Sequence, residues 1–340
     1  MPLQADIRFL VLMVTSRCNL ACSYCYAGAD GRGRDMSWQT AQQAMELVRA
    51  QPRSALVELA GGEPLLNFDL IRRLLETYGK DTRFALQSNG LLLDKAKLDF
   101  LAEHGVGLGL SLDGPPRIND LTRGSSSRVL QALELLNREG AGVNLTVVLS
   151  RHNVESIPEL ILLCARYRAV RVINLDLLRT LGRAHGAELQ PTPAQIAAMV
   201  PEMLAALAFV NQRRFPPLKV REVEQTIKRA AEGQARPYCF AAQGQAAAVS
   251  PDGRLHPCAC LAGHEDFAAG TVQHPDVPAL GQLSDAQGLD PRCADCPILT
   301  VCRGGCPSRR VSFNASRVRR SELECTLRRT LYSELVGPVA

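Results

Sequence analysis

The chain has 340 residues, 46% of them hydrophobic, which is enough to bury the core of one large domain and a smaller one. The formal net charge of +5 comes from Lys and Arg residues scattered along the sequence, so charge gives no indication of nucleic-acid binding. No apolar run approaches the ~20 residues of a membrane span, and the start has neither a basic flank nor a signal-peptidase site. We therefore expect a cytoplasmic protein that binds neither nucleic acid nor a membrane.

Apolar runs of strand length alternate with segments of helical period from the start of the chain to about its middle. The predicted strands are residues 7–15, 55–59, 83–87, 107–112, 143–149 and 170–177. The predicted helices are residues 38–50, 69–78, 95–103, 129–139, 157–167 and 193–212, with one more at 220–232. Six strand–helix units in succession favour a parallel sheet with helices outside it. Periodicity alone allows either a doubly wound sheet or an open barrel.

Three cysteines follow the first predicted strand, Cys18, Cys22 and Cys25, with the spacing C-x3-C-x2-C. Iron–sulfur clusters are normally held by four thiolates, so three of them leave one iron open to a substrate or cofactor. A structural zinc site prefers four ligands in matching pairs, and a disulfide framework is typical of small secreted chains. We therefore predict a four-iron cluster here.

Polar, glycine-containing motifs follow the next three predicted strands: GGEP at 61–64, SNG at 88–90 and SLDG at 111–114. Each of them alone is an ordinary turn sequence. In barrels of parallel strands, however, the chemistry lies at the carboxyl ends of the strands. The three motifs and the cysteine loop are therefore expected to form one site.

The loop CNLACSYCY, together with GGEP, resembles the cluster loop of the radical S-adenosylmethionine (radical SAM) enzymes. The resemblance implies a partial (β/α)6 TIM-like barrel whose cluster chelates SAM and releases a 5′-deoxyadenosyl radical from it. We expect glycine in GGEP because the backbone must approach the ligand closely, and Asp113 to cap the element that follows it. The residues implied to contact SAM are Tyr24 at the adenine, Gly61, Gly62, Glu63 and Pro64 at the methionine amino group, Ser88 and Asn89 near the ribose, and Ser111 and Arg123 at the ribose and carboxylate.

Eight of the twelve cysteines lie from Cys239 onward. Their pattern, C-x13-G-x4-C, then C-x2-C-x5-C-x3-C, then C, resembles the SPASM extension of radical SAM enzymes, which implies two auxiliary [4Fe-4S] clusters and three in all. Auxiliary cluster I would take Cys239, Cys258 and Cys306, with its fourth iron open or bound by Cys260, and auxiliary cluster II would take Cys293, Cys296, Cys302 and Cys325. A zinc ribbon of Cys293, Cys296, Cys302 and Cys306 is the alternative, although it leaves the outlying cysteines unused. The segment SPDGRLHP predicts a hairpin turn, and Cys164 lies in an apolar run that predicts a small buried side chain.

The resemblance divides the chain into a barrel at residues 1–215, a linker helix at 216–235 and a cysteine-rich SPASM domain at 236–340. It implies an oxidoreductase that modifies a peptide or protein substrate oxidatively, through a thioether, C–C or C–O cross-link or a related maturation. Formylglycine formation of the anaerobic sulfatase type ranks lower, because Ala259 replaces an acidic residue and Ala60 a glutamine. Modification of a small molecule such as a sugar stays an alternative. A zinc-binding or electron-transfer scaffold is a further alternative, but it would leave GGEP, SNG and Arg123 unexplained.

The substrate and the electrons both require partners. Only 17 residues precede Cys18, so we expect the peptide either to be recognised directly or to be presented by a separate leader-binding protein. The resemblance further implies a flavodoxin or a ferredoxin-type protein as reductant. No residue of the sequence is identified as the catalytic base.

Overall fold

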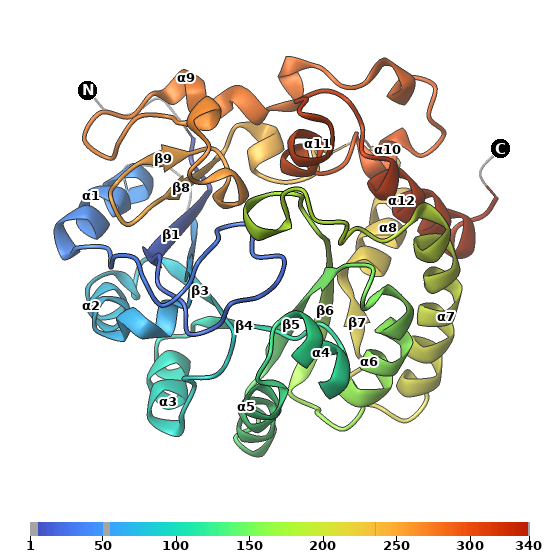
Figure 1. Ribbon diagram of the computed structural model, residues 1–340, viewed down its shortest axis with the longest axis horizontal. Coiled ribbons are helices and arrows are strands. Elements are labelled where there is room, and N and C mark those ends of the chain that lie inside the picture. Colours follow the sequence, from blue (N-terminus) through green and yellow to red (C-terminus); the bar gives the residue numbers. More distant parts are fainter. Residues whose placement is uncertain (1–5, 50–54, 235, 339–340) are drawn as a thin grey trace. The chain divides into compact units, whose positions relative to one another are not determined.

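The structure of the chain is a computed structural model that describes residues 6–49, 55–234 and 236–338 (Figure 1). Residue 50, the end of one predicted helix, lies outside the described residues. The chain divides into two compact units, and we describe each by itself. The first comprises Met1–Ala21, Cys25–Gly109 and Cys239–Gly288, and the second comprises Cys22–Tyr24, Leu110–Tyr238 and Leu289–Ala340.

The first unit is built on the strand order β3-β2-β1-β8-β9. Strand β8, although distant in sequence, lies parallel to β1 with Phe9 opposite Ala246, and β8 and β9 form the antiparallel hairpin that SPDGRLHP predicts. The elements of this unit are β1 (Phe9–Thr15), α1 (Trp38–Arg49), β2 (Leu56–Gly61), α2 (Phe68–Tyr78), β3 (Arg83–Ser88), α3 (Lys95–Glu103), β8 (Ala246–Val249), β9 (Leu255–His256) and α9 (Val277–Leu280).

Strand β1 is buried on both faces, which explains why its sequence is a continuous apolar run. Successive side chains of a strand point to opposite faces. Leu10, Leu12 and Val14 join the core under α1 and α2, whereas Val11 and Met13 form a separate cluster with Ala248. Segment 246–256 therefore completes the core of the first unit.

The second unit contains the parallel strands β5, β6 and β7. The C-terminal helix α12 packs against α7 and α8, so the end of the chain is part of the core of this unit. Its elements are α4 (Pro116–Thr122), α5 (Ser126–Arg138), β5 (Val143–Leu149), α6 (Ile157–Cys164), β6 (Val170–Leu177), α7 (Pro193–Asn211), β7 (Lys219–Val220), α8 (Arg221–Glu232), α10 (Leu299–Cys302), α11 (Pro307–Asn314) and α12 (Glu322–Leu335).

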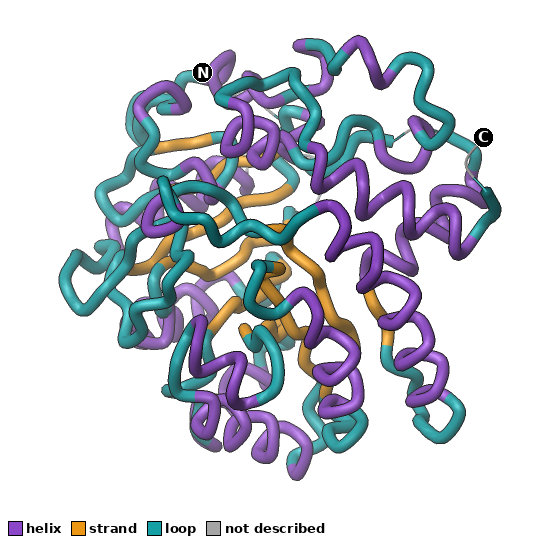
Figure 2. Tube along the Cα trace, turned by 45° about the vertical axis from the view of Figure 1, so that its right-hand side comes forward, coloured by secondary structure: helices purple, strands orange, loops and turns teal. Residues whose placement is uncertain are grey.

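The predicted succession of six strand–helix units is confirmed, with β4 (Gly107–Ser111) beginning in the first unit and ending in the second. Figure 2 distinguishes the strands, the helices and the loops that connect them. Helix α4 was missed, because the double proline at its start is typical of turns, although proline is also well tolerated in the first turn of a helix. Cys164 is fully buried, as predicted.

Helix α7 corrects one expectation from the sequence. Its 19 residues are long and apolar enough to cross a membrane by length and composition, and it is the one such helix among the described residues. It contains Pro201 and buries Ile196, Met199 and Met203. Because α7 packs against α6 and α12, its apolar face already has partners within the second unit.

Candidate active site

Glu63 joins two of the predicted motifs within the first unit. Its side chain is fully buried, and its Oε1 accepts hydrogen bonds from the Ser88 hydroxyl at 2.8 Å and from the Leu65 amide at 3.1 Å. Its Oε2 accepts from the Asn89 amide at 2.7 Å. A carboxylate taken out of water is stable only when such donors satisfy it. Glu63 therefore fixes GGEP at the end of β2 to SNG at the end of β3, a contact that the sequence did not predict.

Gly61 and Gly62 lie against the entrance of the cysteine loop. The Gly61 backbone has φ +139°, and a Cβ there would lie 2.2 Å from the Thr15 carbonyl oxygen. A Cβ on Gly62 would lie 2.2 Å from the Arg17 carbonyl oxygen. The requirement for glycine thus already follows from close packing of two backbone segments, a reason different from the ligand approach that we expected.

Two N–H groups of the same unit lie near the Cys18 sulfur. Its Sγ lies 3.4 Å from the Leu20 amide and 3.9 Å from the Asn89 side-chain amide, which also donates to Asn19 Oδ1 at 2.8 Å. Donors of this kind suit a thiolate, since hydrogen bonds to an ionised acceptor are the strong ones. Cys25, in the same unit, is half-buried. This donor set fits a cluster ligand.

Tyr24 forms a buried network with residues of the SLDG motif in the second unit. Its hydroxyl donates to Asp113 Oδ2 and accepts from Arg123 Nη1 at 2.7 Å. Thr122 Oγ1 donates to the same Asp113 oxygen at 3.0 Å, and Asp113 Oδ1 accepts from the Val148 amide at 3.1 Å. Asp113 thus anchors Tyr24, which corrects the expectation that it caps the next helix.

The electrostatics of this network keep the phenol protonated. Burial raises the pKa of Tyr24 well above its ordinary value, and Asp113 adds to this, although Arg123 acts against it. Cys22 is also buried, and its carbonyl oxygen accepts from Arg183 Nη1 at 3.2 Å. Ser111, predicted to contact SAM, is half-buried at the end of β4. The middle of the cysteine loop is therefore held by hydrogen bonds to polar side chains.

Four cysteines of the second unit line one small cavity. They are Cys293, Cys296, Cys302 and Cys325, the set predicted for auxiliary cluster II. Cys306, which the zinc-ribbon alternative requires, is not among the described residues that line this cavity. Within the described parts of the chain, no three His, Cys, Asp or Glu side chains are grouped as around a single metal ion. In a four-iron cluster each thiolate binds a different iron.

The charges around this cavity suit a set of thiolates. Arg320 and Arg329 line it, and Arg329 Nη2 donates to Cys296 Sγ at 3.6 Å. Burial raises the pKa of Cys302 to about 12 and that of Cys325 to about 11 when no metal is bound. Ionised thiols here therefore need compensating positive charge, which the two guanidinium groups provide in part and a bound cluster would complete.

The cysteines predicted for auxiliary cluster I are described in separate units. Cys239, Cys258 and Cys260 belong to the first unit and are half-buried, and Cys258 lies two residues after the end of β9. Cys306 belongs to the second unit and is buried. Their grouping around one cluster stays a prediction.

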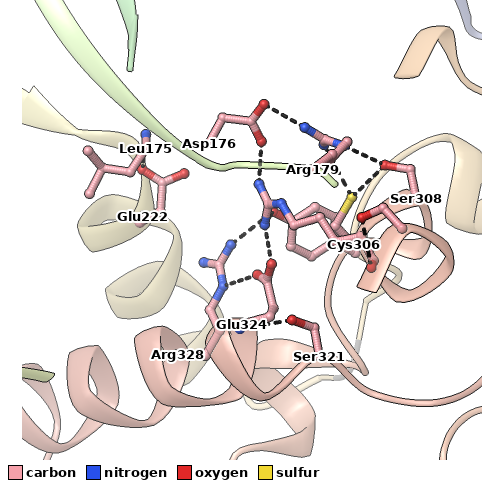
Figure 3. Close-up of polar contacts among 12 residues, drawn as sticks. Leu175, Asp176, Arg179, Glu222, Cys306, Ser308, Ser321, Glu324 and Arg328 are labelled. Atoms are coloured by element: carbon pink, nitrogen blue, oxygen red, sulfur yellow. Dashed lines mark hydrogen bonds and ion pairs between the residues drawn. The ribbon is translucent and has the colours of Figure 1, made fainter. Parts of the chain in front are cut away.

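Cys306 lies beside a buried charge network that the sequence analysis missed (Figure 3). Asp176, one residue before the end of β6, pairs with Arg179 at 2.7 Å and also with Arg309. Arg309 in turn pairs with Glu324, which accepts from Arg328 Nε at 3.0 Å. A charged residue near the end of an apolar strand was the one available signal, since Arg309, which links Asp176 to the rest of the network, lies 133 residues further along the chain.

The same network limits what Asp176 can do chemically. Burial acts to raise its pKa, but Arg179 and Arg309 outweigh it and hold the pKa of this carboxyl well below its usual range. A carboxylate so weakly basic is a poor proton acceptor. Asp176 is therefore a structural anchor of the arginines.

A cavity of about 600 Å³ lies in the second unit, beyond the ends of β5 and β6. Its lining includes the polar side chains of Arg151, Thr180, Glu188 and Gln195. Arg151 donates from its amide to the Leu189 carbonyl oxygen at 2.9 Å, which ties the loop after β5 to the loop before α7. The cavity is within the size range of small-molecule pockets and opens at the carboxyl ends of strands.

Residues 12–164 match the sequence profile of the Radical SAM superfamily. These residues therefore form a radical SAM domain. The predictions of this family, of its fold class and of an enzyme are confirmed. SAM and a four-iron cluster are the cofactors of this family, and Cys18, Cys22 and Cys25 lie within the matched residues.

Similar proteins extend the comparison beyond residue 164. Mycofactocin maturase MftC from Mycobacterium ulcerans is 26% identical over 314 residues, which cover 86% of this chain and 81% of MftC. AdoMet-dependent heme synthase from Oleidesulfovibrio alaskensis is 23% identical over 353 residues, which cover 94% of this chain and 87% of the heme synthase. The solved structure of native anSMEcpe with bound AdoMet and Cp18Cys peptide has a TM-score of 0.77 at 19% identity, over 96% of this chain and 95% of that one. The fold is therefore shared over almost the whole chain, the cysteine-rich part included.

Proposed function

We propose that the protein cleaves SAM reductively and modifies a peptide oxidatively, forming a thioether, C–C or C–O cross-link or a related product. The observation that carries the proposal is the single cavity lined by Cys293, Cys296, Cys302 and Cys325. Four thiolates suit a closed cluster that transfers electrons. A peptide substrate is supported by the maturase name of MftC and by the peptide bound to anSMEcpe.

Each cofactor has its own set of residues in the proposal. Cys18, Cys22 and Cys25 hold the SAM cluster, and the SAM contacts are those predicted from the sequence. Cys239, Cys258 and Cys306 hold auxiliary cluster I, and the four cavity cysteines hold auxiliary cluster II. When bound, SAM and its cluster supply a 5′-deoxyadenosyl radical that removes a hydrogen atom from the substrate.

The chain's own residues position these groups. Glu63 fixes the GGEP and SNG segments to each other through both carboxylate oxygens. Asp113 and Arg123 hold Tyr24 from two sides, so the middle of the cysteine loop has a fixed conformation. The cavity beyond β5 and β6 provides room for a substrate segment. Such preorganisation is how a protein directs the chemistry of a cofactor.

An oxidative modification needs an electron acceptor. A substrate that has lost a hydrogen atom must lose a further electron and a proton to become a closed-shell product. Arg320 and Arg329 beside the four-cysteine cavity favour the uptake of negative charge there. A flavodoxin or ferredoxin-type reductant, a separate leader-binding protein and a cytoplasmic location complete the proposal.

The test uses anaerobically reconstituted protein with dithionite and SAM. We expect about twelve irons per chain, the content of three four-iron clusters, and formation of 5′-deoxyadenosine. The double variant Cys302→Ala/Cys325→Ala should lose about four irons, should still cleave SAM and should form no product from a peptide. Unchanged iron in this variant, or zinc in its place in the wild-type protein, would refute the assignment.

A small-molecule substrate is the second candidate. The alignment with the heme synthase covers 94% of this chain at 23% identity, compared with 86% at 26% identity for MftC. In addition, the cavity of about 600 Å³ is large enough for a small molecule. Mass spectrometry of reactions with candidate precursor peptides and with an iron porphyrin separates the two. If the porphyrin loses hydrogen and the peptides are unchanged, the small-molecule function is favoured over peptide modification.

A further inference from the structure

Arg179 is held on three sides, and one of these contacts is a cluster cysteine (Figure 3). Its Nη1 pairs with Asp176 Oδ2 at 2.7 Å, and its Nε donates to the Ser308 hydroxyl at 2.9 Å. Its Nη2 donates to Cys306 Sγ at 3.6 Å. Only 9% of the side chain is exposed. The guanidinium is thus directed at the thiol by two other bonds.

The partners of Arg179 are themselves immobilised. Asp176 is shared with Arg309, which pairs with Glu324, and the side chains of Arg309 and Glu324 are 4% and 3% exposed. Ser308 lies 3.2 Å from Cys306 Sγ, so it bridges the guanidinium and the thiol. The network runs from the end of β6 to α12 within the second unit. Movement of Arg179 away from Cys306 would therefore disturb a set of buried ion pairs, which is unfavourable.

A cation at this place has a definite electrostatic consequence. Reduction of an iron–sulfur cluster adds one negative charge, and hydrogen bonds to the ligand sulfurs set the potential at which this happens. A buried guanidinium that donates to a thiolate stabilises the more negative, reduced state. Little solvent is present to screen this interaction, because Cys306 and Arg179 are both buried or nearly so.

We propose that Arg179 is a positioning residue that holds the Cys306 thiolate and raises the reduction potential of the cluster bound there. This cluster then accepts an electron more readily than it would without the arginine. The inference rests on the proposed function in one respect, namely that Cys306 binds a cluster. Nothing in the sequence pattern of the cysteines points to Arg179, which lies 127 residues before Cys306.

The chain offers a control for this effect, an exposed arginine at the other predicted cluster. Arg329 Nη2 also lies 3.6 Å from a cysteine sulfur, but the cysteine is Cys296 of the four-cysteine cavity. Arg179→Gln and Arg329→Gln therefore remove the same donor at the same distance from different thiolates. Each variant should change the potential of its own cluster and leave the other unchanged.

The experiment is an EPR-monitored redox titration of the full-length chain carrying Cys18→Ala, Cys22→Ala and Cys25→Ala, so that only the auxiliary clusters contribute. Iron analysis should give about eight irons per chain, from two four-iron clusters. A further Cys306→Ala variant identifies the signal that belongs to Cys306. If this variant changes neither the iron content nor the signal, the proposed cluster assignment fails, whatever potential the Arg179 variants show.

In this background, Arg179→Gln should lower the potential of the Cys306 cluster. The expected change is about tenfold in the one-electron equilibrium, which is about 59 mV. Arg179→Lys keeps the charge and one donor and should give an intermediate potential. An unchanged potential in Arg179→Gln overturns the inference. If Arg179→Gln fails to take up iron, the potential of the Cys306 cluster in Arg179→Lys tests the proposal instead. A wild-type potential in this variant would count against the proposal, and a lowered potential would support it.

Discussion

Substitution of Gly62 by alanine should disable SAM cleavage without removing any ligand. The added Cβ would lie 2.2 Å from the Arg17 carbonyl oxygen, 2.6 Å from its carbon and 3.1 Å from the Cys18 nitrogen. Carbon–oxygen contacts are normally no shorter than ~3.3 Å, so the two backbones must part by about 1 Å. Separation also weakens the hydrogen bond from the Glu63 amide to the Arg17 carbonyl oxygen, now 2.8 Å long.

The magnitude follows from these two effects. Overpacking of this kind destabilises by about 1–3 kcal/mol, and the weakened hydrogen bond adds about 1 kcal/mol. This is a fraction of the stability of a typical domain, so the chain should still fold. A shift of about 1 Å at a reacting centre can lower a rate by about 100-fold. We expect that decrease in 5′-deoxyadenosine formation.

The assay compares reconstituted wild-type, Gly62→Ala and Gly31→Ala proteins under anaerobic conditions with dithionite and SAM. An alanine Cβ at position 31 would meet no atom within 4 Å, so this variant controls for the loss of a loop glycine. It should cleave SAM at the wild-type rate. Wild-type cleavage by Gly62→Ala would show that this glycine does not set the position of the cysteine loop.

Three further predictions concern buried polar groups. Glu324→Ala removes the buried carboxylate that Arg309 and Arg328 share, although Arg309 keeps its pair with Asp176. It should lower the free energy of unfolding by about 3–5 kcal/mol in denaturant titrations. Glu159→Ala, at an exposed ion pair, should change the free energy of unfolding by less than about 1 kcal/mol, and equal effects of the two variants would contradict the assignment. Tyr24→Phe removes a hydroxyl that is bonded to buried Asp113 and half-buried Arg123, and should lower the free energy of unfolding by about 1–3 kcal/mol while the iron content is retained. Unchanged stability would show that these bonds contribute nothing. Burial raises the pKa of Cys164 from 9.0 to about 12. The neutral thiol's contribution to stability is therefore complete below pH 9 and is lost as the pH rises toward 12. Rapid alkylation of Cys164 in the native protein at pH 8 would contradict the raised pKa.

The strands and most helices were predictable because each depends on local pattern. The runs 143–149 and 170–177 match β5 and β6 at both ends, since an apolar run bounded by polar residues leaves little choice of limits. The succession of six units predicted a parallel sheet with outer helices in the same way, and the family resemblance then selected the barrel. Helix α4 was missed because it begins at a double proline, which occurs both in turns and in the first turn of helices.

Sequence patterns could not predict the contacts between segments that are distant in the chain. Strand β8 lies beside β1 although more than 200 residues separate them, so part of the cysteine-rich region belongs to the core of the first unit. Glu63 was predicted as a ligand contact, yet the structure gives it three donors from the chain itself. The pairing partners of a buried carboxylate depend on which segments fold together, and this is set by packing of the whole core.

The sequence by itself indicated the radical SAM domain, because thiolate ligands must recur at fixed spacings and such spacings are visible in one dimension. It also named the four cysteines that line one cavity in the second unit. Only the tertiary structure decided how these ligands are supported. The contacts of Arg179 with Cys306, of Glu63 with Asn89 and of Tyr24 with Asp113 join residues 127, 26 and 89 positions apart. Buried charges and hydrogen bonds require geometry, and geometry arises only when the segments that carry the partners are packed together.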